Sequence, residues 1–410
     1  MTSFLTNFKF NQKNILVLLI AFFPVSLIVG SALINCSIII IDLLFLYILI
    51  QERKIKFLNQ HTFYLLLFLW CTLIINMTLS LSIENSFSRT FGFIRFIFFI
   101  FAIKFVLNKN KVDDKIIFFS WIAIFSIVTV DIIFESIFGF NTLGFSNNFP
   151  GRISSFLHDE LKIGNYYFGF VLLSLSFIYY NYKKNYFLLF LVFFIFVSFL
   201  IGERSNFIKV FTLIFIFFFL VDKMNLWKKI IILSSFLILA FAIISQNESY
   251  KNRFVNQLTG DLASHNYDVI KFYKFTTYGA HHNVAYQIFK NYPYFGVGLK
   301  NFRMESGDSE YINSEFRFNK YRQNTHPHQV HLEFLSELGL FGYISFFMFF
   351  YVFLKKSIIV QLKSKNLYHL SGILFIIISF MPLIPSGSFF TTYGAAIFWL
   401  NFSIIDSFNN

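Results

Sequence analysis

The chain has 410 residues, of which 56% are hydrophobic and only 13% are charged, and its mean hydropathy is +0.63. A soluble globular domain carries about 25% charged residues, so this composition excludes one. The formal net charge of +13 would suggest a nucleic-acid partner in a soluble protein. Here the basic residues lie mostly in short loops between apolar runs, so membrane topology accounts for most of the excess.

Phe-rich apolar runs recur along nearly the whole chain, and runs of about 18 residues or more are typical of membrane-spanning helices. A β-barrel would show segments of about ten residues with alternating polarity. We therefore predict an all-α, polytopic membrane protein with about twelve transmembrane helices. The predicted spans are 14–33, 34–50, 62–81, 91–107, 115–138, 161–181, 186–201, 206–221, 227–245, 331–354, 368–384 and 389–407.

Basic residues are concentrated in every second short loop. They precede the first span and follow every second span up to the tenth. They are Lys9, Lys13, Arg53, Lys54, Lys56, Lys109, Lys111, Lys115, Lys183, Lys184, Lys223, Lys228, Lys229, Lys355, Lys356, Lys363 and Lys365. Cytoplasmic loops carry the excess of Lys and Arg, so this pattern predicts an even number of spans with both termini in the cytoplasm.

Two segments on the predicted non-cytoplasmic side are long, at about 139–160 and 246–330. The second is the only sizeable polar stretch, and it holds most of the histidines. We expect one integrated membrane domain, with about nine spans over 1–245, a partly helical periplasmic loop over 246–330 and about three spans over 331–410. Loops of this length in a compact protein are usually functional.

Arginines are scarce on the predicted non-cytoplasmic side, so those present there are informative. Arg204 lies in a tight turn between two spans, Arg152 lies in the first long segment, and Arg89 and Arg95 flank the start of the fourth span. Arginine suits phosphate because its fork donates two parallel hydrogen bonds. The alternative is a structural pair such as Glu203–Arg204, or contact with lipid headgroups. We favour phosphate binding for Arg204, leave Arg152 open, and favour the structural alternative for the other two.

The segment 324–342 contains three histidines at the start of the tenth span. Thr325 or His326 can cap a helix whose first residue is Pro327. His328 would then lie in the first helical turn, at the external membrane surface. The positive potential of a helix N-terminus would keep His328 neutral, as a general base requires, and would attract a diphosphate.

Within the same segment, His331 and Leu332 would share a helix face with His328. Gly339 and Gly342 would let another helix approach closely. The three histidines could instead form an interfacial cluster or a metal site. His-x-His across a proline is a poor zinc spacing on one helix face, so we expect no metal.

A second histidine-containing segment is 280–298, which predicts an amphipathic helix that ends at a proline and is followed by a glycine turn. Ala285, Ile288 and Phe289 supply its apolar stripe. His281 lies at the head of this helix, and a lone histidine in that position is more often structural.

These segments resemble the O-antigen ligase and polymerase superfamily of bacterial envelope glycan assembly. The first match is the short turn with Arg204. The second is 291–298, which is similar to the family's Pro-x-x-Gly-x-Gly signature. The third is 328–342, which is similar to its His-Asn-x-x-Leu-x-x-x-x-Glu-x-Gly-x-x-Gly pattern. The best-matched region covers roughly 200–345.

Elsewhere the resemblance lies mainly in hydropathy, with short stretches at 151–156 and at Asp159 and Glu160. The chain departs from the family pattern in two places. Gln329 stands where the family usually has Asn, and this change retains an amide. The helix before the glycine turn lacks the family's arginine, so one phosphate contact falls to His281 or Arg303.

The resemblance implies a glycosyltransferase of the bacterial inner membrane that works at the periplasmic face without a metal or other cofactor. Its donor would be a glycan on undecaprenyl diphosphate, and its acceptor lipid A-core or a lipid-linked glycan. The donor diphosphate would be bound by Arg204, Arg152, His281 and Arg303. His328 would act as the general base, with His326 and Glu337 in support. One base and no nucleophilic carboxylate predict a single displacement with inversion.

Three functions stay open at this stage. A ligase joins a finished glycan to lipid A-core, and the His328 motif favours it slightly. A polymerase extends the glycan on its own carrier. A lipid-linked oligosaccharide transporter would also need a basic, lipid-facing cavity. Transporters tend to show repeated halves with broken or charged midplane helices, whereas the candidate residues here crowd one membrane face.

Overall fold

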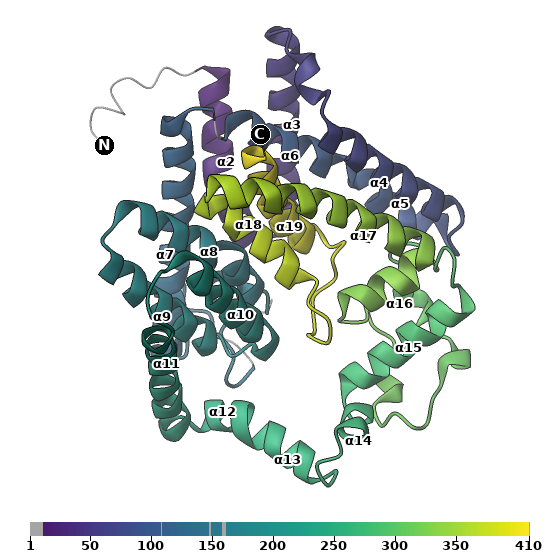
Figure 1. Ribbon diagram of the computed structural model, residues 1–410. Helices are drawn as coiled ribbons and strands as arrows, with labels where there is room; N and C mark the ends of the chain where they lie inside the picture. The colour runs from purple at the N-terminus through teal and green to yellow at the C-terminus, as the bar shows by residue number, and fades with distance from the viewer. Residues whose placement is uncertain (1–10, 108, 147–148, 158–160, 410) are drawn as a thin grey trace.

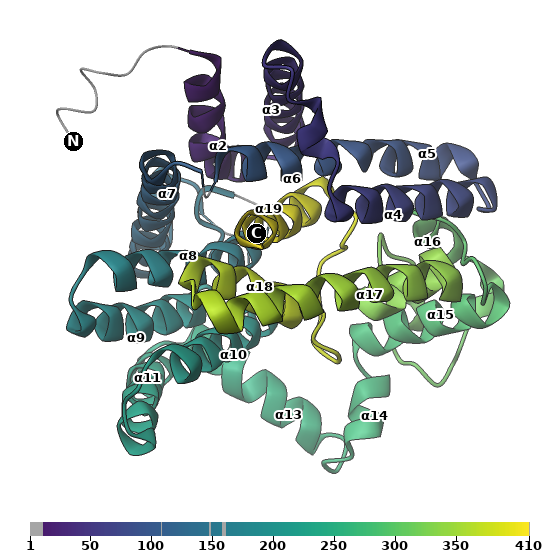
Figure 2. The same cartoon turned by 45° about the horizontal axis from the view of Figure 1, so that its top comes forward.

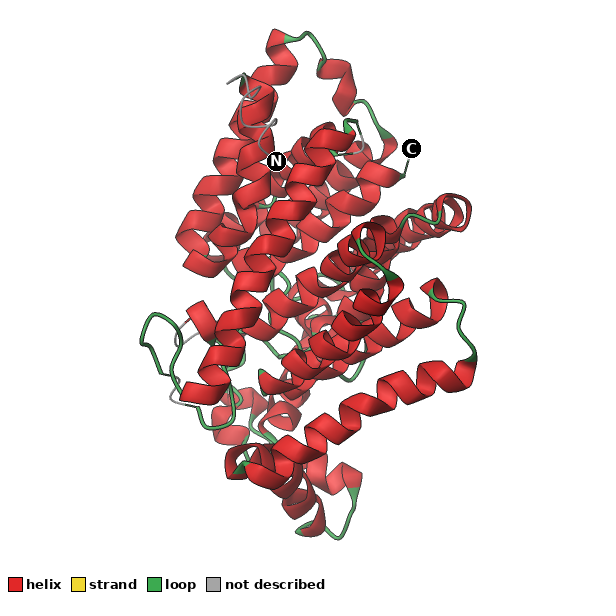
Figure 3. Ribbon diagram, turned by 90° about the vertical axis from the view of Figure 1, so that its left-hand side faces the viewer, coloured by secondary structure: helices red, strands yellow, loops and turns green. Residues whose placement is uncertain are grey.

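The computed structural model describes residues 11–107, 109–146, 149–157 and 161–409. Within these ranges every regular element is a helix, as Figure 3 shows by colour. The predicted all-α fold class is therefore confirmed. Lys9, Asp159 and Glu160 lie outside the described residues.

Each predicted span overlaps one helix. These helices are α2 (Gln12–Val29), α3 (Ser31–Gln51), α4 (His61–Thr78), α6 (Ile94–Val106), α7 (Lys111–Phe138), α8 (Ile163–Asn181), α9 (Lys184–Leu200), α10 (Arg204–Val221), α11 (Leu226–Gln246), α17 (Val330–Ser364), α18 (Leu367–Ser379) and α19 (Thr392–Phe408). Among the described residues, eight helices are long and apolar enough to cross a membrane: α2, α3, α4, α7, α8, α10, α11 and α17. The chain is thus a multi-pass membrane protein, while the count of twelve spans stays a prediction.

The centre of the bundle is built on α8, which packs against α7, α9, α10, α18 and α19. In α8, 83% of the apolar stretch is buried, including Tyr166 and Phe170. A helix that is apolar on every side belongs in such an interior position. In α11 only 22% is buried, and Trp227 and Phe241 are exposed. The outer face of α11 therefore has the composition of a lipid-facing surface.

In Figure 1, α2 and α3 lie at the top, and the short helices α12 (Glu248–Lys251), α13 (Gln257–Ala263) and α14 (Val269–Lys274) cross the bottom. They join α11 to α15 (Thr277–Asn291) and α16 (Phe302–Glu305), which contact α17; Figure 2 shows the same arrangement from another side. This polar segment has a small apolar core of its own, separate from the bundle core. Its buried residues are Val284, Ala285, Ile288, Val297, Phe302 and Tyr311.

A buried ion pair joins the early helices to the last one. The Nζ of Lys104 on α6 lies 2.8 Å from Oδ2 of Asp406 on α19. The hydroxyl of Thr62 on α4 donates to the other carboxylate oxygen at 2.9 Å. Lys104 is 5% exposed and Asp406 1%. Removing either partner would leave the other charged group buried alone, which is strongly destabilising.

Candidate active site

The turn that follows α15 is inserted into a break in α17, which brings two of the predicted motif segments together. Gly339 interrupts α17 with φ 62° and ψ −170°. The amides of Val297 and Gly298 donate to carbonyl oxygens just before the break at 2.9 and 2.8 Å. The amides of the two residues after Gly339 donate back to the turn at 2.8 and 3.0 Å. The carbonyl groups that the break releases are therefore satisfied by the turn, as burial requires.

The glycines at this junction are required by close contact between the two backbones. Gly296 and Gly339 both have positive φ, and a Cβ on Gly339 would lie 2.5 Å from the amide nitrogen of Gly296. The prediction was that Gly339 and Gly342 let another helix approach closely. In the described part of the chain, no other helix is the partner of either glycine. The Gly296 turn approaches Gly339, and a Cβ on Gly342 would meet Leu338 of its own helix.

His328 lies just before α17, not in its first turn. The helix begins at Val330, and the side chain of Gln329 caps it by accepting a hydrogen bond from the amide of Leu332 at 2.8 Å. His328 has φ 57°, in the left-handed region, so the helix cannot include it. The predicted cap at Thr325 or His326 is therefore wrong. The departure at Gln329 is explained, because glutamine supplies the capping oxygen that asparagine would supply.

Histidines from α15 and from the segment before α17 form one cluster, the histidine cluster, made of His281, His282, His326 and His328. The rings of His281 and His328 stack with centroids 5.2 Å apart, and those of His326 and His328 lie 4.1 Å apart. The Asn324 amide lies 3.2 Å from Nε2 of His281 and 3.4 Å from Nε2 of His328. The structure thus brings the predicted base, its predicted support and His281 together.

Burial keeps the histidine cluster neutral. It lowers the pKa of His328 to about 4, with the neighbouring His281 adding to the effect. Burial first, then His328 and His281, lower the pKa of His326 to about 3. The pKa of His282 falls to about 4 by burial, then by His281 and His328. The expected neutrality of His328 therefore agrees with these shifts, but the cause is desolvation and neighbouring imidazoles, not the helix N-terminus.

His331 does not share a face with His328. Its Nδ1 lies 3.1 Å from the hydroxyl of Tyr343, and its Nε2 lies 2.9 Å from the carbonyl oxygen of Phe380. The bond to Phe380 connects α17 to the end of α18, so His331 has a structural role. The prediction failed because His328 lies outside the helix, and helical spacing therefore does not relate the two side chains.

Three arginines gather at the ends of α9 and α10, and they form the arginine cluster: Arg152, Arg204 and Arg253. Arg253 lies in a π-helical turn over Asn252–Asn256. Its Nε donates to the carbonyl oxygen of Gly202, in the turn that precedes Arg204. Burial, then the charges of Arg152 and Arg204, lower the pKa of Arg253 to about 10. The sequence analysis missed Arg253, although the scarcity of arginine on this face was a signal that includes it.

Carboxylates on α7 hold the segment that carries Arg152. Glu135 accepts hydrogen bonds from the amides of Ser154 and Ser155, the latter at 2.6 Å. Oδ2 of Asp131 accepts a hydrogen bond from the hydroxyl group of Ser155 at 2.5 Å. The amide of Ile153 donates to the carbonyl oxygen of Ile201 at 3.0 Å. The loop is thus fixed against the turn before α10, which explains why two arginines distant in sequence share one site.

Tyr278 connects the two clusters. Its ring lies 5.7 Å from the ring of His328 and 6.2 Å from that of His282. Its phenol group is also close enough to Arg253 to act on the charge of that guanidinium. The arginine and histidine clusters are therefore neighbours across one tyrosine, although their residues are far apart in the sequence.

Glu337 and Arg303 form a second polar group beside the histidine cluster. Oε1 of Glu337 accepts the amide of Lys300 at 3.0 Å, and within the described chain its Oε2 is buried without a hydrogen bond. Arg303 and Arg89 both lie within electrostatic range of Glu337. Arg303, a predicted diphosphate ligand, is thus brought to this carboxylate and not to the arginine cluster. Arg89 also lies within electrostatic range of His326, and its structural interpretation stays a prediction.

Among the residues that the structure describes, no three His, Cys, Asp or Glu side chains are grouped so that they could hold a metal ion. The arginine cluster supplies three cations to the site. A site with three clustered guanidinium groups and neutral imidazoles is suited to binding an anion and accepting a proton.

Comparison with curated proteins finds no match for this chain. Comparison with family models finds one over residues 189–347, described as O-antigen ligase. The matched stretch runs from α9 into α17 and so contains Arg204, Arg253 and the whole histidine cluster. This match shows that residues 189–347 are similar to the O-antigen ligase family, and it supports the resemblance of the chain to the O-antigen ligase and polymerase superfamily.

Proposed function

We propose that the chain is an O-antigen ligase-type glycosyltransferase. It transfers a glycan from undecaprenyl diphosphate to a hydroxyl group of lipid A-core, at the periplasmic face of the bacterial inner membrane. The observation that carries the proposal is the adjacency of the arginine cluster and the neutral histidine cluster through Tyr278. The first suits a diphosphate, and the second suits the removal of a proton from the acceptor.

The arginine cluster supports donor binding. The charges of Arg152 and Arg204 act on Arg253 more strongly than the carboxylate of Glu203 does. An incoming diphosphate would relieve that repulsion and accept several charge-assisted hydrogen bonds. The diphosphate is also the leaving group, so the same guanidinium groups would stabilise the charge that develops on it.

His328 is proposed as the general base. The acceptor oxygen forms a bond to the anomeric carbon while the bond from that carbon to the diphosphate oxygen breaks. The acceptor proton goes to the imidazole, and the electron pair leaves with undecaprenyl diphosphate. In the free protein the pKa of His328 is about 4, which makes it a weak base. A bound diphosphate anion would favour imidazolium and raise that pKa toward the working pH.

Glu337 and His326 are proposed as supporting groups. Glu337 accepts the amide of Lys300 and so fixes the segment after the glycine turn. The ring of His326 packs on that of His328 at 4.1 Å. The polar segment between α11 and α17 would cover donor and acceptor and exclude water, which would otherwise compete for the glycan.

The decisive experiment uses the full-length protein in liposomes with a purified lipid-linked donor. Lipid A-core and a lipid-linked repeat are offered as separate acceptors. Glycan on lipid A-core supports the ligase, and chain extension on the carrier lipid assigns a polymerase. Movement of the donor without a new glycosidic bond would make the protein a transporter. Product linkage by NMR tests the single displacement, because retention at the anomeric carbon contradicts it.

A further inference from the structure

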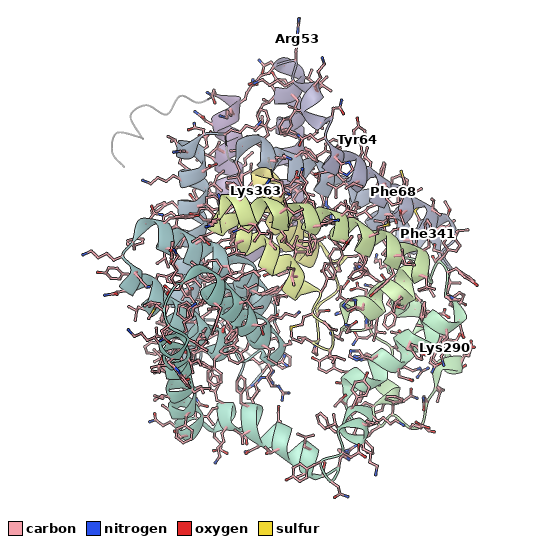
Figure 4. All side chains as sticks on the ribbon, in the orientation of Figure 1. Arg53, Tyr64, Phe68, Lys290, Phe341 and Lys363 are labelled. Atoms are coloured by element: carbon pink, nitrogen blue, oxygen red, sulfur yellow. The ribbon has the colours of Figure 1, made fainter. Side chains whose placement is uncertain are left out.

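A second basic site lies at the opposite end of the molecule from the polar segment. It is a hollow of about 430 Å³ at the ends of α2, α3 and α6, and we call it the basic hollow. Figure 4 shows Arg53 at the top of the molecule and Lys290 of α15 at its lower right edge. The basic hollow is lined by Lys13, Glu52, Arg53, Lys54, Lys56, Phe57, Phe105 and Lys109.

The positive charge of the basic hollow is only partly matched. Lys13 pairs with Asp113 at 3.0 Å, and Lys54 pairs with Glu52 at 2.6 Å. Across the described chain, no ion pair with a carboxylate involves the other three cations of the hollow. These three are Arg53, Lys56 and Lys109.

Single lysines in two other basic loops on this side have a partner within the protein. Lys184 pairs with Asp222 at 2.9 Å. The ammonium group of Lys229 donates to the carbonyl oxygen of Asp222 at 2.6 Å. The basic hollow differs from these loops in bringing the cations of several chain segments together.

The positive-inside rule explains why each loop is basic, but it does not explain why three loops converge on one hollow. Convergence of like charges is unfavourable. Burial, then the charges of Lys54, Lys104 and Lys13, lower the pKa of Lys109. An anion bound in the hollow would offset the cost of bringing these charges together.

Two phenylalanines, Phe57 and Phe105, line the basic hollow together with its charged residues. The Nζ of Lys109 lies 4.3 Å from the ring centroid of Phe57 and 5.4 Å from that of Phe105. Below the hollow, the outer face of α3 exposes Leu43, which is 62% exposed, and Ile50, which is 65% exposed. A headgroup in the hollow would thus have an apolar helix face beside its acyl chains.

We propose that the basic hollow binds the phosphate of an anionic phospholipid headgroup, with the acyl chains along the exposed face of α3. Basic pockets between transmembrane helices on the cytoplasmic side are suited to such headgroups, because each cation near the surface adds attraction. This proposal does not depend on glycan transfer, so its test does not use that activity.

The test compares wild type with two triple variants of the full-length protein in nanodiscs. The first, Arg53→Gln/Lys56→Gln/Lys109→Gln, removes three charges from the basic hollow. The matched control, Lys355→Gln/Lys356→Gln/Lys363→Gln, removes three exposed charges from the end of α17. The discs contain phosphatidylglycerol diluted in phosphatidylcholine, and native mass spectrometry counts the lipids retained after the discs are removed.

Wild type and control should retain phosphatidylglycerol over phosphatidylcholine, and the hollow variant should lose this preference by about tenfold or more. Equal retention by all three proteins would overturn the proposal. A second arm adds inorganic phosphate at millimolar concentration. If free phosphate displaces the lipid from wild type, the hollow is a site for a soluble anion, and the lipid proposal is wrong.

Discussion

At the scale of single residues, the conformation of His328 gives a clean way to test the proposed base. Asparagine tolerates the left-handed conformation that His328 adopts, but it cannot accept a proton. His328→Asn should therefore fold normally and lose about 100- to 10,000-fold in the rate of glycan transfer. His331→Asn is the control, since His331 has structural partners only. Wild-type transfer by His328→Asn would remove His328 from the mechanism.

The pH dependence follows from the lowered pKa of His328. The base must be neutral, and its pKa in the free protein is about 4. The value of kcat/KM should therefore stay level as the pH falls from about 7.5 to about 5.5, and decline only nearer 4. An exposed histidine would instead give a decline near about 6.5. A pH profile of kcat/KM checks this, and a midpoint near 6.5 would contradict it.

Acid should also destabilise the histidine cluster. The pKa values of His282 and His328 are lower in the folded protein than in the unfolded chain. The unfolded chain therefore binds more protons, and the stability linked to these groups is present above about pH 6.5 and is lost as the pH falls toward 4. Each sample is returned to pH 7 before glycan transfer is assayed. Activity lost through titration alone then returns, whereas activity lost through acid unfolding does not.

Arg204 offers the cleanest test of donor binding. It is exposed at the first residue of α10, whereas Arg253 also holds the Gly202 turn. Arg204→Ala should raise KM for the lipid-linked donor by roughly 10- to 100-fold, because a charge-assisted bond to phosphate is lost. Lys290→Ala, on the exposed surface of α15, is the matched control. An unchanged donor KM would refute the role of Arg204.

At this scale the sequence indicated which residues are candidates for the site, but it did not indicate which of them lie side by side. Scarcity of arginine on one face singled out Arg204 and Arg152 as candidates, and the same signal should have included Arg253. The proximity of Arg89 to Glu337 could not be predicted, because it depends on how α5 (Ile83–Gly92) packs, which no local pattern encodes. The same limit applies to Arg303, whose chemistry fits phosphate but whose neighbour is a carboxylate.

At the scale of elements, the break in α17 makes one glycine a structural requirement. Gly339→Ala would force a Cβ against the backbone of Gly296, in a conformation that alanine disfavours. We expect a destabilisation of about 2 kcal/mol or more, seen as a lower midpoint of thermal unfolding in detergent. Gly387→Ala is the control, because nothing lies within 4 Å of its added Cβ. Equal midpoints for the two variants would show that the junction is not rigid.

Element positions were predictable where hydrophobic length alone decides them. Each predicted span overlaps a helix because an apolar run of that length has few other stable states in a membrane. The start of α17 was not predictable. Thr325 and Pro327 form a reasonable start signal, but the left-handed His328 intervenes, and the amide of Ser386 donates to its carbonyl oxygen at 2.8 Å. That partner comes from the loop between α18 and α19, so tertiary contact overrode the local signal.

At the scale of the whole molecule, the two basic sites should face opposite sides of the membrane. Figure 4 separates Arg53 from Lys290 along the length of the molecule. In a chain with Cys36 and Cys71 replaced by serine, Arg53→Cys should react with an impermeant maleimide only in opened cells. Lys290→Cys should react once the outer membrane alone is permeable. Labelling of both positions from the same side would contradict the predicted topology.

The ion pair between Lys104 and Asp406 has a consequence for the order in which the protein is made. The two residues are 302 positions apart in the chain. During synthesis, the early helices are complete long before the carboxylate of α19 emerges, and until then the ammonium group lacks the partner that it has in the folded protein. A cation without a partner in the bilayer is costly and open to recognition by membrane proteases. We therefore expect the nascent bundle to become resistant to degradation only when α19 arrives.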